Sequence, residues 1–337
     1  MLEINWNEGV VNDPVILADY IELTIAIDSE HEGMVFTHAD FVNAVQEAPY
    51  NDIEDSFLEG DEVDETKCHF EDALSLIERR RQWLGSLHPF VVDGDEVRLA
   101  PGSDRDEWTP YVFLLACSHY ASITGKGPRL ETEFEKICKE AMKALFSESA
   151  DVFLFSQFSH DRAKLGRSAR EAVKNLAAML NTSMVRPEEE IPTGPNEFGI
   201  DIIAIDALDD RLGYPFFAFA QCTVSQSSRE WGRKNSEARA DHGLAAYILL
   251  NVQHSNFLFI PHLPREDFDT LDESVLPHEI SNCVFCDRYR ICKALHRLAY
   301  FRDGEPRRFI AEIIDAFLDS YGAKLCSDSL SDFTPTA

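Results

Sequence analysis

The hydrophobic pattern of the first ninety residues is helical. Apolar side chains recur at three- and four-residue spacing, which is the repeat of one face of an α-helix. The clearest case contains Phe70, Leu74 and Ile77, with charged residues between them. The pattern therefore predicts helices over residues 14–28, 39–47 and 69–87.

A strand-like pattern follows the third helix. Asp93 and Gly94 stand between two short β-rich runs and predict a β-hairpin over residues 90–99. Helices followed by a hairpin suggest a winged-helix-like module, although the acidic surroundings are equally typical of a module that docks proteins. The acidic stretch 51–67 has few apolar anchors and is expected to be a loop.

The second half of the chain alternates between helical and strand patterns. Continuous apolar, β-rich runs are typical of strands that are buried on both faces. Their order with the helices predicts a mixed α/β fold in which a sheet is flanked by helices, preceded by a mainly helical N-terminal domain. The expected strands are 200–205, 215–222 and 256–264, and the expected helices are 131–146, 167–181, 237–253 and 305–321.

Charge divides the chain into an acidic first part and a more balanced second part. The net charge is −29 over 337 residues, and residues 1–120 hold 27 Asp or Glu against 6 Lys or Arg. No apolar stretch is long enough to span a bilayer, and the first residues lack a secretory pattern, so a cytoplasmic protein is expected. The expected divisions are an acidic helical domain at 1–125, a helical connector at 126–164, an α/β core at 165–270 and an extension at 271–337.

Local basic runs interrupt the acidity of the second part. Each run alone is typical of a solvated helix face, and a nucleic-acid interface would need all three to converge on one groove. The runs are Arg162, Lys164, Arg167 and Arg170; Arg229, Arg233 and Lys234; and Arg288, Arg290, Lys293 and Arg297.

Polar side chains at the ends of two apolar strands indicate the chemistry of a metal-dependent phosphodiesterase. Asp201 heads one strand, Gln221 ends the next, and Glu171 lies on the helix before them. Each offers a side-chain oxygen, the ligand that Mg²⁺ prefers, and phosphodiester hydrolysis also needs a lysine near the attacking water. Glu135 is the rival of Glu171 as the helix carboxylate, and Glu197 lies close to Asp201 in sequence.

This layout resembles the PD-(D/E)xK nuclease superfamily, in particular its Mrr-like restriction-endonuclease branch. That branch has a helix glutamate, then a strand of the form G-[IV]-D-[IV]-[IV]-A, then a strand ending in Q-C-K. This chain has Glu171, then GIDIIA at 199–204 and AQC at 220–222. The resemblance covers residues 165–265 and implies a restriction-endonuclease-like fold, with Mg²⁺ or Mn²⁺ held by the aspartate and the glutamine.

One position departs from the family pattern. Where the branch has lysine, two residues after the glutamine, this chain has Thr223, whose hydroxyl cannot supply a positive charge. A variant of the group resembles this chain more closely, because its strand ends in Q-C-A/T and is followed by W-x-x-K. Trp231 and Lys234 match that element, so the resemblance implies Lys234 as the fourth catalytic residue, with Glu171, Asp201 and Gln221.

Three cysteines and a histidine near the C-terminus have the spacing of a metal site. Cys283, Cys286, Cys292 and His296 form C-x2-C-x5-C-x3-H, which could hold a structural Zn²⁺. The cysteine spacing also resembles part of the iron–sulfur motif of some exonucleases in the same superfamily. The alternative is a buried strand at 282–286 followed by an amphipathic helix, in which the cysteines are small core residues.

The resemblance implies two functions of different classes. The first is a metal-dependent endonuclease of nucleic acid, with DNA the expected substrate, in bacterial restriction or defence against phage. Its acidic N-terminal domain would bind a protein partner, and homo-oligomers would allow both strands to be cut. The second is an inactive adaptor subunit that keeps the nuclease fold and assembles with protein partners. A transcription regulator with a winged-helix module agrees less well with the acidity of the N-terminal domain.

Overall fold

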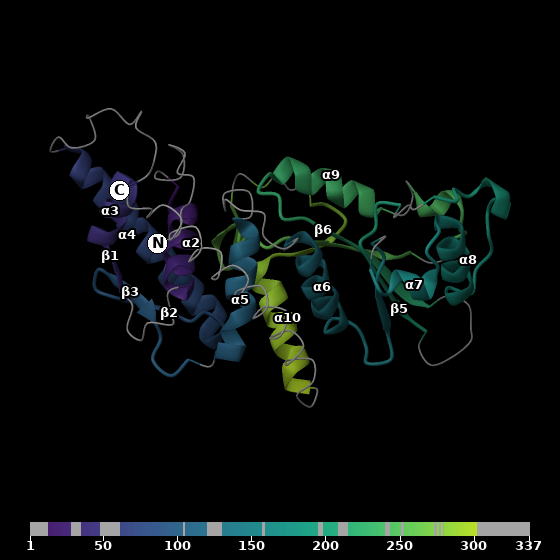
Figure 1. Ribbon diagram of the computed structural model, residues 1–337, viewed down its shortest axis with the longest axis horizontal. Coiled ribbons are helices and arrows are strands. Elements are labelled where there is room, and N and C mark those ends of the chain that lie inside the picture. Colours follow the sequence, from purple (N-terminus) through teal and green to yellow (C-terminus); the bar gives the residue numbers. More distant parts are fainter. Residues whose placement is uncertain are drawn as a thin grey trace, which may run out of the picture. The chain divides into compact units, whose positions relative to one another are not determined.

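The computed structural model divides the chain into two compact units (Figure 1). Unit 1 comprises Met1–Pro128 and Arg307–Ala337, and unit 2 comprises Arg129–Pro306. The expected C-terminal helix at 305–321 and the residue Glu197 lie outside the described residues. The structure describes residues 13–27, 35–47, 61–103, 105–119, 130–156, 159–194, 198–207, 215–239, 243–250, 253–272, 275, 278 and 280–301.

Unit 1 consists of helices and a small antiparallel sheet, in which the expected hairpin is joined by a third strand at Val35–Thr37 that the hydrophobic pattern did not predict. Its three strands have the order β1-β3-β2, and the predicted hairpin forms with its turn at Gly94 and Asp95, since Asp93 pairs with Glu96. Helix α4 begins at Asp61, so the end of the acidic stretch expected as a loop is helical. The elements are α2 (Pro14–Ile27), β1 (Val35–Thr37), α3 (His38–Glu47), α4 (Asp61–Leu84), β2 (Phe90–Asp93), β3 (Glu96–Leu99) and α5 (Arg105–Ser118).

A buried cluster of charged side chains joins the helices of unit 1. Arg80 Nη1 lies 2.6 Å from Asp19 Oδ1 and 3.0 Å from Glu22 Oε2. Glu22 also accepts a hydrogen bond of 2.7 Å from Tyr111 and lies 2.8 Å from His88 Nε2. Burial alone would raise the pKa of Glu22, but the charge of Arg80 and the hydrogen bond to His88 outweigh it, so that this pKa is lowered. Burial also lowers the pKa of His88.

These two shifts predict that acid destabilises unit 1. Both folded-state pKa values lie below the unfolded ones, so the unfolded chain takes up protons first as the pH falls. The stability is fully present about one pH unit above the ordinary histidine pKa of about 6.5, where unfolded histidine is neutral, and it is lost progressively as the pH falls through that value. We expect the melting temperature of unit 1 to fall between about pH 7.5 and about pH 5.5.

The variant His88→Gln isolates the histidine contribution to this acid effect. It should show a smaller fall in melting temperature over the same interval, because the group that titrates near neutrality is gone. Equal falls in the wild type and the variant would contradict the role of His88.

Unit 2 is built on a five-stranded mixed sheet in the order β10-β7-β6-β5-β4. The last three are antiparallel neighbours, whereas β7 and β10 run parallel to β6. The connection from β6 to β7 contains helix α9, since parallel neighbours need a crossover. The strands are β4 (Asp151–Leu154), β5 (Ile202–Asp206), β6 (Phe216–Cys222), β7 (Ser255–Phe259) and β10 (Val284–Cys286), with a separate hairpin of β8 (Arg265–Asp267) and β9 (Thr270–Leu271).

Helices cover both faces of this sheet (Figure 1). Residues of α8 pack in one cluster with Ile203 and Phe219, and Trp231 of α9 packs on Leu258. On the other face, Cys138 of α6 lies beside Cys222, and α10 packs on α6. The helices are α6 (Leu130–Lys143), α7 (Arg162–Leu165), α8 (Ala169–Met179), α9 (Ser228–Ala238) and α10 (Arg288–Phe301). The expected mixed α/β architecture with a helix-flanked sheet is confirmed.

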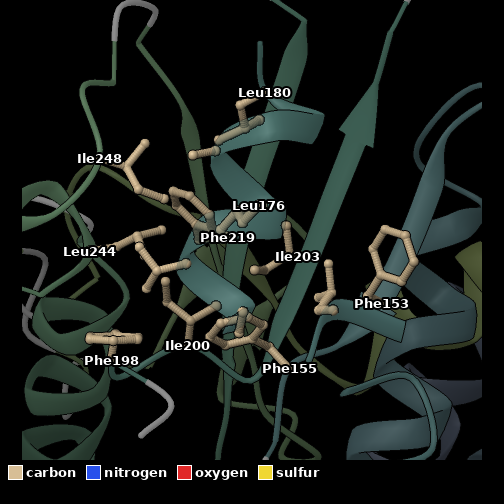
Figure 2. Packing of buried hydrophobic residues seen from close by; sticks show 14 of the residues in the cluster. Phe153, Phe155, Leu176, Leu180, Phe198, Ile200, Ile203, Phe219, Leu244 and Ile248 are labelled. Carbon is tan, nitrogen blue, oxygen red and sulfur yellow. The ribbon is translucent and has the colours of Figure 1, made fainter. Parts of the chain in front are cut away.

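The core under α8 holds the β5–β6 pair in place (Figure 2). Figure 2 shows Leu176 above Ile203 and Phe219, with Leu244 and Ile248 at the side, and all five side chains are fully buried. Burying each such side chain stabilises the fold by about 1.5–3 kcal/mol. This packing anchors β5, the strand that Asp201 directly precedes.

The expected helix at 237–253 is wrong. Helix α9 ends at Ala238, and beyond the gap in the described residues only a short 3₁₀ turn forms at Leu244–Ala246. Leu244 and Ile248 are drawn into the core under α8, and Ile248 forms a β-bridge with Met184. Tertiary packing therefore overrides the helical periodicity of this segment.

The sheet extends beyond the segment expected to form the core, 165–270. The expected connector supplies α6 and β4, which pairs with β5 along its length. The expected C-terminal extension supplies β10 and α10. A short edge strand such as β4 or β10 has too few residues for its pairing to be read from a local pattern.

Candidate functional site

Asp201 and Gln221 meet because β5 and β6 pair in antiparallel register. Ile202 lies opposite Ala220, so the residue before Ile202 reaches the level of the residue after Ala220. The backbone N–H of Asp201 donates to Ala220 O (2.9 Å), and its carboxylate Oδ2 accepts from the N–H of Cys222 (2.8 Å). The carboxylate therefore lies against the peptide that joins Gln221 to Cys222.

The side-chain oxygen of Gln221 is buried without a hydrogen-bond partner among the described residues. Gln221 is only 2% exposed, and its Oε1 accepts no hydrogen bond. It lies opposite Leu258, which packs under Trp231, so the amide points to the face that α9 covers. An unsatisfied buried acceptor costs roughly 1–3 kcal/mol, and such a group calls for a bound ligand or ion.

Thr223 has a structural role at the position where the family has lysine. Its backbone N–H donates to Phe259 O (3.1 Å), and its hydroxyl accepts from the N–H of Ser225 (3.2 Å). These bonds shape the turn that leads into α9. Thr223 itself supplies no positive charge.

Helix α9 carries Lys234 across the sheet towards the start of β5. At one end Trp231 is fixed on Leu258, and its Nε1 donates to Ser225 O (2.6 Å). At the other end the helix approaches Gly199 so closely that a Cβ there would lie 2.8 Å from Glu237 O. Gly199 also has a φ of +71°, which favours glycine.

Lys234 lies between these two anchors, and its side chain is directed along α9. Its Nζ is 3.8 Å from Glu237 Oε2, and the side chain is 26% exposed. Glu237, its ion-pair partner, abuts Gly199, which lies two residues before Asp201.

Glu171 is engaged in the N-terminal cap of α8. Its carboxylate accepts from the N–H of Ser168, and its own N–H donates to the Ser168 hydroxyl, which together form a capping box. Hydrogen bonds to Ser168 lower the pKa of this exposed carboxylate. The structure thus gives Glu171 a local structural function.

Glu135 of α6 is the helix carboxylate that lies near the strand ends. Burial and the neighbouring Cys138 thiol raise the pKa of Cys222, and the negative charges of Asp201 and Glu135 raise it further. Both carboxylates therefore lie close enough to Cys222 for their charges to act on it. Glu135, the alternative to Glu171 as the helix carboxylate, therefore lies near Asp201.

Lys139 and Asp161 also lie at this edge of the sheet, and the sequence patterns did not indicate either of them. Lys139 Nζ lies 2.6 Å from Asp161 Oδ2, which also accepts from the N–H of Leu154 at the end of β4. The next residue, Phe155, donates to Asp201 O (2.7 Å). The only signal in the sequence is that Lys139 follows Glu135 by one helical turn.

The donors at Asp201 and Gln221 fit a hard cation with few protein ligands. Both offer oxygen, and Mg²⁺ is commonly held by one or two side chains with water and substrate phosphates completing its shell. In the part of the chain that the structure describes, no group of three or more His, Cys, Asp or Glu is arranged to hold a metal ion. Asp201 and Gln221 each offer one side-chain oxygen at this end of the sheet.

The cysteine cluster is distributed over a strand and a helix. Cys283 packs near Trp231 on the α9 side, whereas Cys286 lies beside Cys138 on the α6 side. Burial raises the pKa of Cys283 and of Cys292 to about 12. His296 is exposed on the outer surface of α10. The strand and helix required by the alternative to a metal site are both present.

Comparisons with known proteins add no relative. None of the helices that the structure describes is both long and apolar enough to cross a membrane. No protein-family model, curated protein or solved structure matches the chain.

Proposed function

We propose that this chain is a metal-dependent nuclease with a restriction-endonuclease-like core, and that its substrate is nucleic acid, with DNA expected first. The observation that carries the proposal is the pairing of Asp201 with the Gln221–Cys222 peptide at one edge of a helix-flanked mixed sheet. The family resemblance requires an aspartate and a glutamine on neighbouring strands, and the register of β5 and β6 supports that requirement.

The chain's own residues would divide the chemistry of phosphodiester hydrolysis among them. Asp201, oriented by the Cys222 N–H, and the unpartnered Oε1 of Gln221 would hold Mg²⁺ or Mn²⁺. When bound, the ion would activate water and offset charge on the phosphate. Lys234 would supply the positive charge that Thr223 cannot, and Trp231 would hold α9 so that this lysine keeps its place.

The surface of unit 1 supports a role in binding protein rather than DNA. Its long helix α4 exposes Glu71, Asp72 and Glu78, and the turn of the hairpin exposes Asp93 and Asp95. Carboxylates on a helix and a hairpin tip repel a phosphate backbone. We therefore propose that unit 1 binds a protein partner, within a cytoplasmic system of defence against phage.

Lys234 gives the first test of catalysis. The full chain should nick supercoiled plasmid when Mg²⁺ or Mn²⁺ is added and not in EDTA, and Lys234→Met should lower the rate on the order of 10²-fold, because one preorganised positive charge is removed. The matched control is Arg233→Met, which removes the neighbouring charge. Arg233 is exposed and held by Glu230 and Glu237. If plasmid, single-stranded DNA and RNA all remain uncut with either metal, the proposed nuclease activity is wrong.

The second candidate is a nuclease-fold adaptor without activity. It is favoured by the engagement of Thr223 in a turn and by the ion pair of Lys234 with Glu237. An adaptor would leave every substrate uncut while the chain binds a protein partner through unit 1. Cleavage that requires Asp201 would exclude it.

A further inference from the structure

The three basic runs of unit 2 differ in how their charges are used. In the first run Arg162 is buried and donates to the carbonyl oxygens of Phe155 and Gly166. In the second, the charge of Arg233 is offset on its own helix by Glu230 and Glu237. Arg162 and Arg233 are therefore engaged within the fold, and so is Arg288 of the third run, which is buried and donates to Pro261 O (2.8 Å). The exposed charges of Arg290 and Arg297 in the third run need another explanation.

Helix α10 is basic and has no acidic residue of its own. Its fourteen residues contain four Lys or Arg and neither Asp nor Glu, in a chain whose net charge is −29. Ile291, Leu295 and Leu298 form the buried side of the helix. The outer side is therefore able to carry charge along its length.

Arg290, Lys293 and Arg297 form a stripe on that outer side. They follow one another at three- and four-residue spacing, so they lie on one side of the helix over about 10 Å of its axis. Arg290 and Arg297 are exposed, and neither forms an ion pair with a described carboxylate. Arg290 donates to Phe285 O (2.5 Å), and Lys293 Nζ lies 5.6 Å from the centre of the Tyr289 ring.

The start of α10 lies on the edge of the sheet that carries Asp201 and Gln221. Strands β6, β7 and β10 are parallel, so all three end at this edge, and α10 begins directly after β10. Two strand spacings, about 10 Å, separate β6 from β10. Figure 1 shows α10 extending away from the sheet from that edge.

We propose that Arg290, Lys293 and Arg297 are a phosphate track that binds the nucleic-acid backbone next to the candidate site. This inference rests on the proposed function, since it names how the substrate of that site is held. The chemistry is charge pairing with phosphates, which is independent of base sequence and weakens with salt. In a strongly acidic chain, such a track offsets the general repulsion of a polyanion where the backbone must approach.

The test is the salt dependence of DNA binding by the full chain, measured by fluorescence anisotropy with a short labelled duplex in EDTA, so that no cleavage occurs. The double variant Arg290→Gln/Arg297→Gln should lower the slope of log K against log salt concentration by about 2, because two phosphates are no longer neutralised by the protein. The weakening should be equal for unrelated sequences. Arg297→Glu alone, at a residue far from Phe285, should also weaken binding and guards against misfolding of the double variant.

The matched control is Lys174→Gln/Arg186→Gln, which removes two exposed charges from the α8 side, each near an acid. It should leave the slope unchanged. A double variant with the wild-type slope, or a wild type that binds no duplex at any salt concentration, overturns the track. The track is also overturned if the double variant no longer self-associates but still binds DNA as the wild type does. In that case the stripe would bind the acidic surface of a second copy of the chain.

The experiments can contradict the phosphate track and the proposed nuclease activity independently of each other. DNA binding that depends on α10 without any cleavage supports the track and contradicts the catalytic part of the proposed function. Cleavage by a chain whose DNA binding ignores the α10 charges supports the nuclease and overturns the track.

Discussion

The substitution Asp201→Asn should lower nucleic-acid cleavage on the order of 10³-fold, because it removes the charge of a metal ligand and with it several kcal/mol of transition-state stabilisation. The fold should remain, since the asparagine oxygen can still accept the hydrogen bond from the Cys222 N–H. The measurement is the rate of plasmid cleavage with Mg²⁺, alongside a thermal melt.

Asp206→Asn is the matched control for this prediction. Asp206 lies at the other end of β5, is as buried as Asp201, and accepts a hydrogen bond from Ser147 (2.5 Å). The same change there should affect stability and not cleavage. If Asp201→Asn cleaves at the wild-type rate, the assignment of the metal site to this edge is wrong, whichever enzyme activity the chain has.

Replacing Arg80 with methionine should destabilise unit 1 by about 3–5 kcal/mol, the usual cost of removing one partner of a buried ion pair. Asp19 and Glu22 would remain buried, without the cation that lies within 3.0 Å of each. Urea unfolding followed by circular dichroism should show an early transition for unit 1, with the transition of unit 2 unchanged.

Two further variants make the Arg80 prediction specific. Arg98→Met removes a largely exposed pair with Asp93 in the same unit and should cost less than about 1 kcal/mol. Arg80→Met combined with Asp19→Asn and Glu22→Gln should recover part of the stability, since the uncompensated charges are removed. An Arg80→Met protein as stable as Arg98→Met would contradict a structural role for the cluster.

The buried cluster and the acidic surface give the two units different physical characters. Unit 1 contains a buried ion-pair cluster beside its apolar core, and it exposes carboxylates on α4 and the hairpin. Unit 2 holds its sheet by apolar packing under α8 and α9, and Asp201 and Gln221 lie at one edge of that sheet. The proposed division of labour, partner binding by unit 1 and catalysis by unit 2, follows from this contrast.

Local sequence predicted those elements whose pattern is decided within one or two turns. The amphipathic helices α6 and α8, the hairpin over residues 90–99, and strands β5 and β6 all form where periodicity and turn chemistry predict them, and α4 forms there but begins earlier, at Asp61. The helix expected at 237–253 failed, because the packing of Leu244 and Ile248 into the core determines the path of that segment. Periodicity alone does not distinguish an apolar helix face from side chains that a distant core buries.

The sequence by itself determined the mixed α/β class, the acidity of the N-terminal part, and the presence of Asp201 and Gln221 at strand ends. Only the tertiary structure decided which other side chains lie near Asp201 and Gln221. Glu171 caps its own helix, whereas Glu135 and Lys139, on a helix expected to be a connector, lie at the same edge as Asp201. The reason is that strand register and helix packing are set by residues far apart in the chain, and their pairing leaves no mark in the local spacing of residues.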